Sequence, residues 1–147
     1  SMIEFTVYGE PVAQGRPRAT TIAGRARLYD PAKSRNYKEY IRLAAADHAP
    51  SALLEGPLLL KIGIYRSIPK SFSKKKTVQA EAREIRPTSK PDVDNYVKGI
   101  KDALNKVIWK DDSQIVSIVA EKFYSQKPRI EVKVQAMEEQ VQQLSII

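Results

Sequence analysis

The sequence contains no cysteine and a single histidine, His48. Without thiols the chain can form neither disulfides nor thiolate metal sites. Zinc sites and histidine-based acid–base schemes generally use more than one imidazole, so both are disfavoured. The absence of cysteine fits a reducing compartment, and we expect a cytoplasmic protein.

Long apolar runs are also missing. No stretch approaches the ~20 apolar residues that a membrane span needs. The first residues lack the basic and then apolar pattern of a signal peptide. We therefore expect no membrane association. At 147 residues the chain is long enough for one domain with a real core and too short for two.

Charge is distributed unevenly along the chain. Residues 1–90 carry 17 Lys and Arg against 8 Asp and Glu, whereas residues 91–147 carry 8 against 9. A basic surface suggests a polyanionic partner, of which nucleic acid is the commonest. The alternative is a soluble basic protein whose charge only prevents aggregation. Charge alone does not choose between these two interpretations.

Apolar periodicity predicts a mixture of strands and helices. Alternating apolar residues predict strands at 3–8, 57–65, 114–124 and 129–135. Helical spacing and capping signals predict helices at 31–49, at 71–84 and from about 94 to 107. Residues 9–31 are rich in Gly, Pro and Arg and predict a long loop or an irregular hairpin. Because regular βαβ alternation is absent, we expect an α+β (mixed α/β) fold, a single compact domain with a small mixed sheet packed by helices.

The stretch KPDVDNYVKGIKDALNKVIWKDD, residues 90–112, concentrates carboxylates in this basic chain. They are Asp92, Asp94, Asp102, Asp111 and Asp112. Asp92 and Asp94 stand at the entrance of the predicted helix, and Asp111 and Asp112 stand just past its other end. At ~1.5 Å per residue the helix separates its two ends by roughly 20 Å. The two pairs can therefore meet only if the chain after Val107 doubles back.

Each carboxylate has an ordinary explanation when taken singly. Acidic residues in a first helical turn complement the macrodipole, and an Asp pair after a helix is common in turns. Taken together, they favour a site for a hard cation such as Mg²⁺. Lys98 lies at i+4 from Asp94, so its ammonium could neutralise a nearby phosphate. We therefore predict metal-assisted phosphodiester hydrolysis, with the basic remainder of the chain binding the nucleic acid.

This motif closely resembles that of the RusA family of Holliday junction resolvases. The family shows K-P-D-x-D-N-x-x-K at a helix entrance and a later D-D-x-Q before an apolar strand, and GEPVAQGRPR at residues 9–18 is similar to its opening. The resemblance implies a homodimeric, Mg²⁺-dependent endonuclease that makes paired symmetrical nicks across four-way DNA junctions in recombination and repair. It assigns residues 1–136 to the endonuclease domain and leaves 137–147 as a C-terminal tail.

Carried over residue by residue, the resemblance assigns the site. It implies that Asp92, Asp94 and Asp112 are catalytic carboxylates and metal ligands, and that Lys98 is the essential lysine. Asp111 matches an adjacent acidic position, and two further motif residues, Asn95 and Gln114, are expected to support the site by hydrogen bonding. Separately, the basic part of the chain predicts a set of phosphate contacts. These are Arg16, Arg18, Arg25, Arg27, Lys74, Lys75 and Lys76.

Symmetry gives an independent reason to expect a dimer. Two cuts related by a two-fold axis call for two identical sites in that relation, which a C₂ homodimer presents. The apolar end LSII and the aromatics Tyr37 and Tyr40, which are expected to be exposed, either contribute to such an interface or pack within one subunit. Trp109 is expected in the core, with base stacking as the alternative.

Two other interpretations remain open. Pro91-Asp92 and Glu131-x-Lys133 spell the letters of a PD-(D/E)xK nuclease. In that class the carboxylates lie on adjacent strands, whereas here Asp92 opens a helix and Glu131 and Lys133 alternate with apolar residues. The other possibility is a non-catalytic basic module that binds DNA, in which the aspartates only cap and turn the chain.

Overall fold

The structure is a computed structural model that describes residues 2–15, 20–22, 25–27 and 31–137. Its strands are β1 (Met2–Tyr8), β2 (Thr20–Ile22), β3 (Arg25–Arg27), β4 (Leu58–Ser67), β5 (Ile115–Ser125) and β6 (Arg129–Ala136). Its helices are α1 (Pro31–Ala46), α2 (Lys74–Glu81) and α3 (Val93–Leu104), with a short 3₁₀ turn, η1 (Asp112–Gln114), before β5. The predicted mixture of strands and helices is confirmed.

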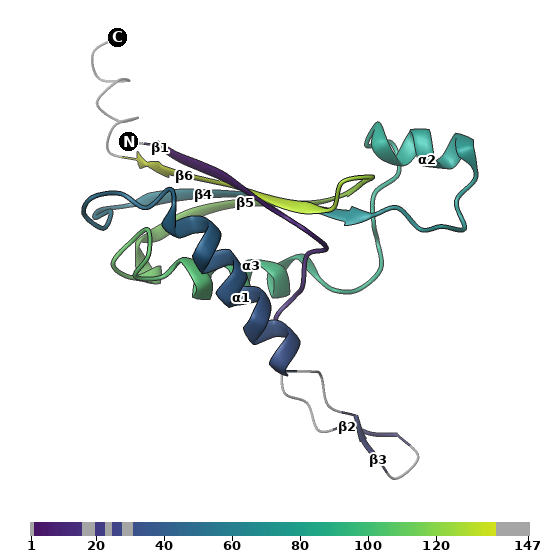
Figure 1. Cartoon of the computed structure of the whole chain (residues 1–147), viewed down its shortest axis with the longest axis horizontal. Helices are drawn as coiled ribbons and strands as arrows, with labels where there is room; N and C mark the ends of the chain where they lie inside the picture. The colour runs from purple at the N-terminus through teal and green to yellow at the C-terminus, as the bar shows by residue number, and fades with distance from the viewer. Residues whose placement is uncertain (1, 16–19, 23–24, 28–30, 138–147) are drawn as a thin grey trace.

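A four-stranded mixed sheet forms the centre of the fold (Figure 1). The strand order is β1-β6-β4-β5, in which β4 and β5 are parallel and the other neighbours are antiparallel. Strands β2 and β3 pair separately as a small antiparallel hairpin within the segment predicted as a loop or irregular hairpin. The prediction of a small mixed sheet in an α+β domain is confirmed.

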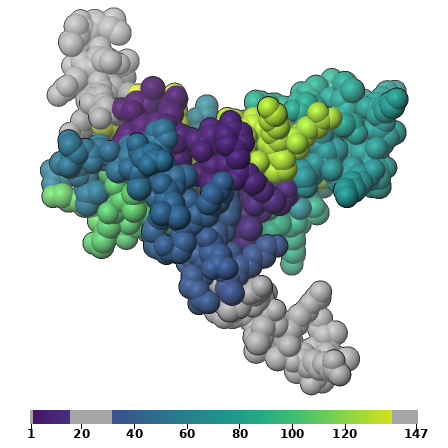
Figure 2. Space-filling model, viewed as in Figure 1, coloured from purple at the N-terminus to yellow at the C-terminus, as the bar shows by residue number. Residues whose placement is uncertain are grey.

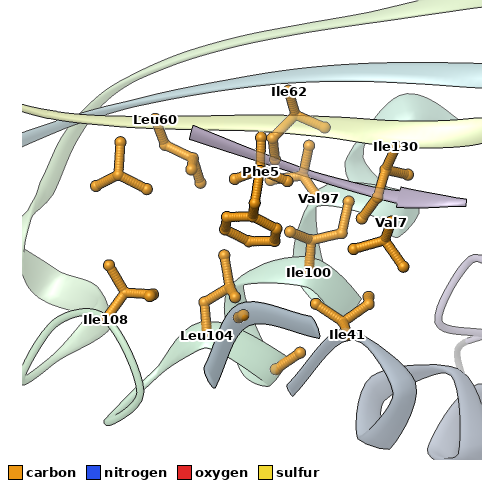
Figure 3. Close-up of a cluster of buried hydrophobic side chains, with 14 of the residues drawn as sticks. Phe5, Val7, Ile41, Leu60, Ile62, Val97, Ile100, Leu104, Ile108 and Ile130 are labelled. Atoms are coloured by element: carbon orange, nitrogen blue, oxygen red, sulfur yellow. The ribbon is translucent and has the colours of Figure 1, made fainter. Parts of the chain in front are cut away.

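One face of the sheet carries the core. Alternation along β4 points Leu60, Ile62 and Ile64 to the same face, where all three are buried. Ile130 of β6 and Phe5 of β1 join them, and helices α1 and α3 cover this face (Figure 3). The intervening residues of the strands, which include Glu131 and Lys133, face the opposite side.

The apolar stripe of α3 is the main helical contribution to the core. Val97, Ile100 and Leu104 are buried against the sheet, and burying each such side chain stabilises the fold by ~1.5–3 kcal/mol. The helix was predicted to reach Val107 but ends at Leu104. Lys106 follows with a φ of 65°, a left-handed conformation that a right-handed helix cannot continue.

The aromatic residues Trp109, Tyr37 and Tyr40 differ in their burial. Trp109 is fully buried, so the core prediction is confirmed. Tyr37 was expected to be exposed, but it lies on the core-facing side of α1, where burial raises the pKa of its hydroxyl. Tyr40 remains 47% exposed, and its hydroxyl donates to the Tyr8 carbonyl oxygen.

Met137 is the last described residue, so the rest of the tail predicted at 137–147 lies outside the described residues. Its amide donates to the Pro57 carbonyl oxygen at 3.0 Å, which fixes the end of β6 beside the start of β4. Within the described part of the chain, no helix has the length and apolar character to cross a membrane.

Candidate functional site

Asp92 occupies the N-cap position of α3 with extended backbone angles, φ −71° and ψ 152°. An aspartate at this position usually accepts a hydrogen bond from an amide of the first helical turn. The Asp92 side chain makes no such capping bond, and it is exposed. Its carboxylate is therefore not used to cap the helix, contrary to the interpretation in which the aspartates only cap and turn.

Asp94 and Lys98 lie one turn apart on the exposed side of α3. Residues at i and i+4 of a helix have Cβ atoms about 5–6 Å apart, so a single substrate group can reach both side chains. The sequence predicted this adjacency, because it depends only on helical periodicity.

The segment after β1 packs along the first two turns of α3. The Gln14 amide donates to the Asn95 carbonyl oxygen at 3.1 Å. A Cβ built on Gly99 would lie 3.4 Å from the Gln14 Cβ, which places this segment in direct contact with the helix. The Asn95 backbone thus ties the segment after β1 to the first turn of α3.

The loop before Asp92 is held by side chains from neighbouring strands. The Lys122 ammonium of β5 donates to the carbonyl oxygens of Ser89, at 2.9 Å, and Pro91, at 3.0 Å. Arg66 of β4 also donates to the Ser89 carbonyl, at 3.2 Å. Sequence reasoning missed Lys122, although a signal existed: it is a charged residue on the otherwise apolar face of its strand.

Asp112 lies at the other end of α3. Its Oδ1 accepts the indole N–H of the buried Trp109 at 2.8 Å. A carboxylate has about four lone-pair sites, so this bond orients the group and leaves acceptor capacity. Trp109 pairs through its backbone with Leu54 and Asn105, which ties Asp112 to the carboxyl end of the helix.

Gln114 anchors the turn that carries Asp112. Its side-chain amide donates to the carbonyl oxygens of Leu54, at 2.9 Å, and Gly56, at 3.1 Å. Its Oε1 accepts the Asp111 amide at 2.8 Å. These bonds fix the turn beside the start of β4, and the supporting role expected for Gln114 stays a prediction.

Asp111 takes part in the same turn. The Ser113 hydroxyl donates to its carboxylate, and this bond holds the pKa of the exposed Asp111 carboxyl below its ordinary value. Asp111 is therefore engaged locally in the backbone turn, next to Asp112.

The two pairs of carboxylates remain apart within one chain. Helix α3 has 12 residues, which at ~1.5 Å per residue amounts to about 18 Å. The connection after Leu104 turns at the helix end, where the Lys106 amide donates to the Trp109 carbonyl oxygen, and it does not double back. Among the residues that the structure describes, no three acidic or histidine side chains gather as a metal site. The structure brings Asp92 near Asp94 and Asp111 near Asp112, but it does not unite the pairs.

Strand β5 has a free edge. In the described sheet it pairs with β4 on one side only, and it is 11 residues long. Val116, Ile118 and Val119 are 62%, 42% and 44% exposed along it. A long edge strand with exposed apolar side chains invites pairing with another strand.

The predicted phosphate contacts fall in two regions. Lys74, Lys75 and Lys76 are exposed on α2, which projects past the end of the sheet (Figures 1 and 2). Ser73 caps this helix by accepting the Lys76 amide at 3.1 Å. Arg16 and Arg18 lie outside the described residues, as do the side chains of Arg25 and Arg27 on β3.

The PD-(D/E)xK arrangement does not fit this fold. Asp92 opens α3, which covers the core face of the sheet. Glu131 and Lys133 line a hollow on the opposite face. Glu131 there accepts bonds from Arg129 and the Tyr65 hydroxyl. The two halves of that motif are therefore separated by the sheet.

Comparisons with known proteins cover nearly the whole described domain. The endodeoxyribonuclease RusA family model matches residues 8–135. The chain is 54% identical over 134 residues to the uncharacterized protein YqaN of Bacillus subtilis (strain 168). This alignment covers 90% of this chain and 94% of that protein. It is 29% identical over 134 residues to the crossover junction endodeoxyribonuclease rusA of Lactococcus phage r1t, with coverage of 89% and 94%.

Proposed function

The chain belongs to the RusA family of endodeoxyribonucleases, and from this premise we propose that it is a Mg²⁺-dependent endonuclease that resolves four-way DNA junctions. It makes paired symmetrical nicks during recombination and repair. The observation that carries the proposal is the exposed Asp92–Asp94–Lys98 group at the start of α3, in which the Asp92 carboxylate is not used for capping.

The donor chemistry of this group fits Mg²⁺. Mg²⁺ prefers hard carboxylate oxygens and is often held by one or two protein carboxylates together with a substrate phosphate. Asp92 and Asp94 provide two such groups within one helical turn, both exposed to an incoming phosphate. When bound, Mg²⁺ would supply a Lewis acid that lowers the pKa of water and stabilises charge on the leaving oxygen.

Asp112 is proposed to join the same metal from a second copy of the chain. Mg²⁺–oxygen distances are about 2.0–2.1 Å, so oxygens on one ion lie no more than about 4 Å apart. The roughly 18 Å length of α3 keeps Asp112 of the same chain far outside that limit. A symmetric dimer offers another Asp112, supplied by the partner subunit.

The free edge of β5 gives such a dimer a specific form. Strand β5 runs from the Asp112 end of α3 to the Asp92 end. Just before the strand, Gln114 bonds to Leu54, which pairs with Trp109 near the carboxyl end of α3, and further along the strand Lys122 bonds to Pro91, next to Asp92. If two β5 strands pair antiparallel about a two-fold axis, the start of each strand lies beside the end of the other. Asp112 of one protomer then lies next to Asp92 and Asp94 of its partner. The pairing also covers the exposed apolar residues of the edge.

Other residues of the site have distinct proposed roles. Lys98 stabilises the charge that develops on the phosphate during cleavage, as a preorganised cation in reach of the group beside Asp94. Gln114 holds the turn that carries Asp112, and the Asn95 carbonyl holds the segment after β1 against the start of α3, through the bonds described above. Asp111 shapes the turn that presents Asp112.

Binding of the DNA is assigned to the basic regions. Lys74, Lys75 and Lys76 form an exposed cationic surface on α2, and we assign the four arginines at 16, 18, 25 and 27 to the same role. Phosphate contacts of this kind provide affinity without reading sequence. A junction, whose strands diverge, offers phosphates to both regions at once.

The test is incubation with a synthetic four-way junction, with and without Mg²⁺, beside a linear duplex of the same sequence. We expect paired nicks in the junction only when Mg²⁺ is present, and little cleavage of the duplex. Junction binding without cleavage at any divalent metal concentration would instead support the non-catalytic DNA-binding module.

A further inference from the structure

The backbone that leads into Asp92 is clamped from β5. The Lys122 ammonium donates to the Pro91 carbonyl oxygen at 3.0 Å and to the Ser89 carbonyl oxygen at 2.9 Å. Pro91 immediately precedes Asp92, so this bond acts one peptide away from the proposed ligand. Hydrogen bonds from an ionised donor are roughly twice as strong as neutral ones.

Lys122 occupies a position where an apolar residue would be expected. It pairs in register with Ile64, which is fully buried on the core face. Ile118 and Ala120, which pair with the buried Leu60 and Ile62, precede it on the same face of β5 at alternate positions. An ammonium is costly to withdraw from water without partners, and the two carbonyl oxygens supply those partners.

Two arginines also hold this loop, and one of them shares the Ser89 carbonyl oxygen with Lys122. Arg66 donates to the Ser89 carbonyl at 3.2 Å, and Arg86 of the loop donates to the Lys122 carbonyl at 2.7 Å. Of these three side chains, Lys122 is the one that reaches the carbonyl next to Asp92. The arginines therefore secure the loop, whereas Lys122 sets its last peptide.

We propose that Lys122 is a positioning residue that orients the Asp92 carboxylate toward its metal. The inference rests on the proposed function. Because Asp92 makes no capping bond with α3, the direction of its carboxylate depends on the backbone that precedes it. Residues that orient metal ligands typically contribute 10–100-fold to metal affinity or activity.

The alternative role is protection of a sheet edge. Inward-pointing charges on edge strands discourage unwanted pairing. In that case loss of Lys122 would increase self-association of the protein and leave metal affinity unchanged. The two roles are therefore distinguished by different measurements.

The experiment compares Lys122→Met with Lys122→Arg, which retains the charge and donors, and with Lys61→Met as the matched control. Lys61 is exposed on the neighbouring strand β4 and faces the opposite side of the sheet. Three quantities are measured for each protein: hydrogen exchange of residues 86–95, Mn²⁺ binding by electron paramagnetic resonance, and the Mg²⁺ dependence of junction cleavage.

We expect Lys122→Met to exchange the amides of the loop at least about tenfold faster and to bind Mn²⁺ about 10–100-fold more weakly. The Mg²⁺ midpoint of cleavage should rise by a similar factor, while junction binding without metal stays unchanged. Lys122→Arg should recover most of the Mn²⁺ affinity, and Lys61→Met should match the wild type. If Lys122→Met does not fold, Lys122→Gln, which keeps an uncharged side-chain NH₂ group as donor, is judged by the same criteria.

Wild-type Mn²⁺ affinity in the folded variant would overturn the positioning role, even if self-association increased. Failure of the wild-type protein itself to bind Mn²⁺ and cut junctions would overturn the proposed function instead. The two failures are therefore separable.

Discussion

Subunit complementation tests the proposed arrangement of the metal ligands most directly. Asp92→Asn and Asp112→Asn should each abolish cleavage as homodimers, because each removes a ligand from both sites. The two variants are then mixed in equal amounts and allowed to exchange subunits. If Asp112 acts across the dimer, one site of each mixed dimer carries both substitutions and the other site carries none.

The magnitude follows from the geometry. The two ends of α3 are about 18 Å apart, whereas carboxylate oxygens on one Mg²⁺ lie within about 4 Å of each other. Asp112 therefore cannot share a metal with Asp92 and Asp94 of its own chain, and a complete site needs Asp112 from the partner subunit. Random exchange makes about half of the dimers mixed, each with one intact site. We therefore expect nicking at about a quarter of the wild-type rate, with nicked junctions accumulating in place of fully resolved ones.

The assay is nicking of a labelled four-way junction, with subunit exchange checked by native mass spectrometry. The matched control mixes Asp92→Asn with Asp94→Asn. These two substitutions affect the same half of the site, so no mixed dimer regains an intact site and activity should stay absent. If exchange is complete and the Asp92→Asn and Asp112→Asn mixture stays inactive, the shared site is refuted.

Four further outcomes are expected. Asp92→Asn should abolish cleavage in gel assays and leave junction binding intact or tighter, because it removes negative charge near phosphate; near-wild-type cleavage would remove Asp92 from the site. Lys98→Ala should lower the cleavage rate by about 10²–10³-fold, and added Mg²⁺ should not restore it. The Tm should barely change, since an exposed i,i+4 ion pair contributes only ~0.3–0.5 kcal/mol to stability. Full recovery at high Mg²⁺ would instead indicate that Lys98 orients Asp94. Replacing Lys74–Lys76 by alanine should flatten the salt dependence of binding by about 0.9 for each phosphate that these lysines neutralise, and an unchanged slope would remove α2 from the DNA surface. Ile100→Ala should lower the free energy of unfolding by ~2–5 kcal/mol in denaturant titrations, and a decrease well below this range would mean that the core closes around the missing side chain.

The sequence by itself determined the local features of the site. Helical periodicity placed Lys98 one turn beyond Asp94, because i,i+4 neighbours depend only on the geometry of the helix. Alternation predicted the strands and the outward position of Glu131 and Lys133. The long motif around Asp92 identified the family, as the match over residues 8–135 confirms.

Tertiary structure decided what depends on distant partners. The apolar stripe continued to Val107, yet α3 ends at Leu104, because the chain turns there to bury Trp109 against Leu54. Tyr37 was expected at the surface and is buried, because α1 packs this side of the helix against the core. Periodicity gives the face of an element that is buried, but it does not give the element that covers it.

The relation between the two carboxylate pairs is the most consequential of these non-local features. From the sequence, the connection of residues 105–112 could either return toward Asp92 or stay at the carboxyl end of the helix. In the structure it stays at that end, because β5 pairs in parallel with β4 and so must start beside Leu58. The same pairing places β5 at the edge of the sheet and brings Lys122 to Pro91. Strand order and direction arise from the packing of the whole sheet, and no local pattern near Asp112 encodes them.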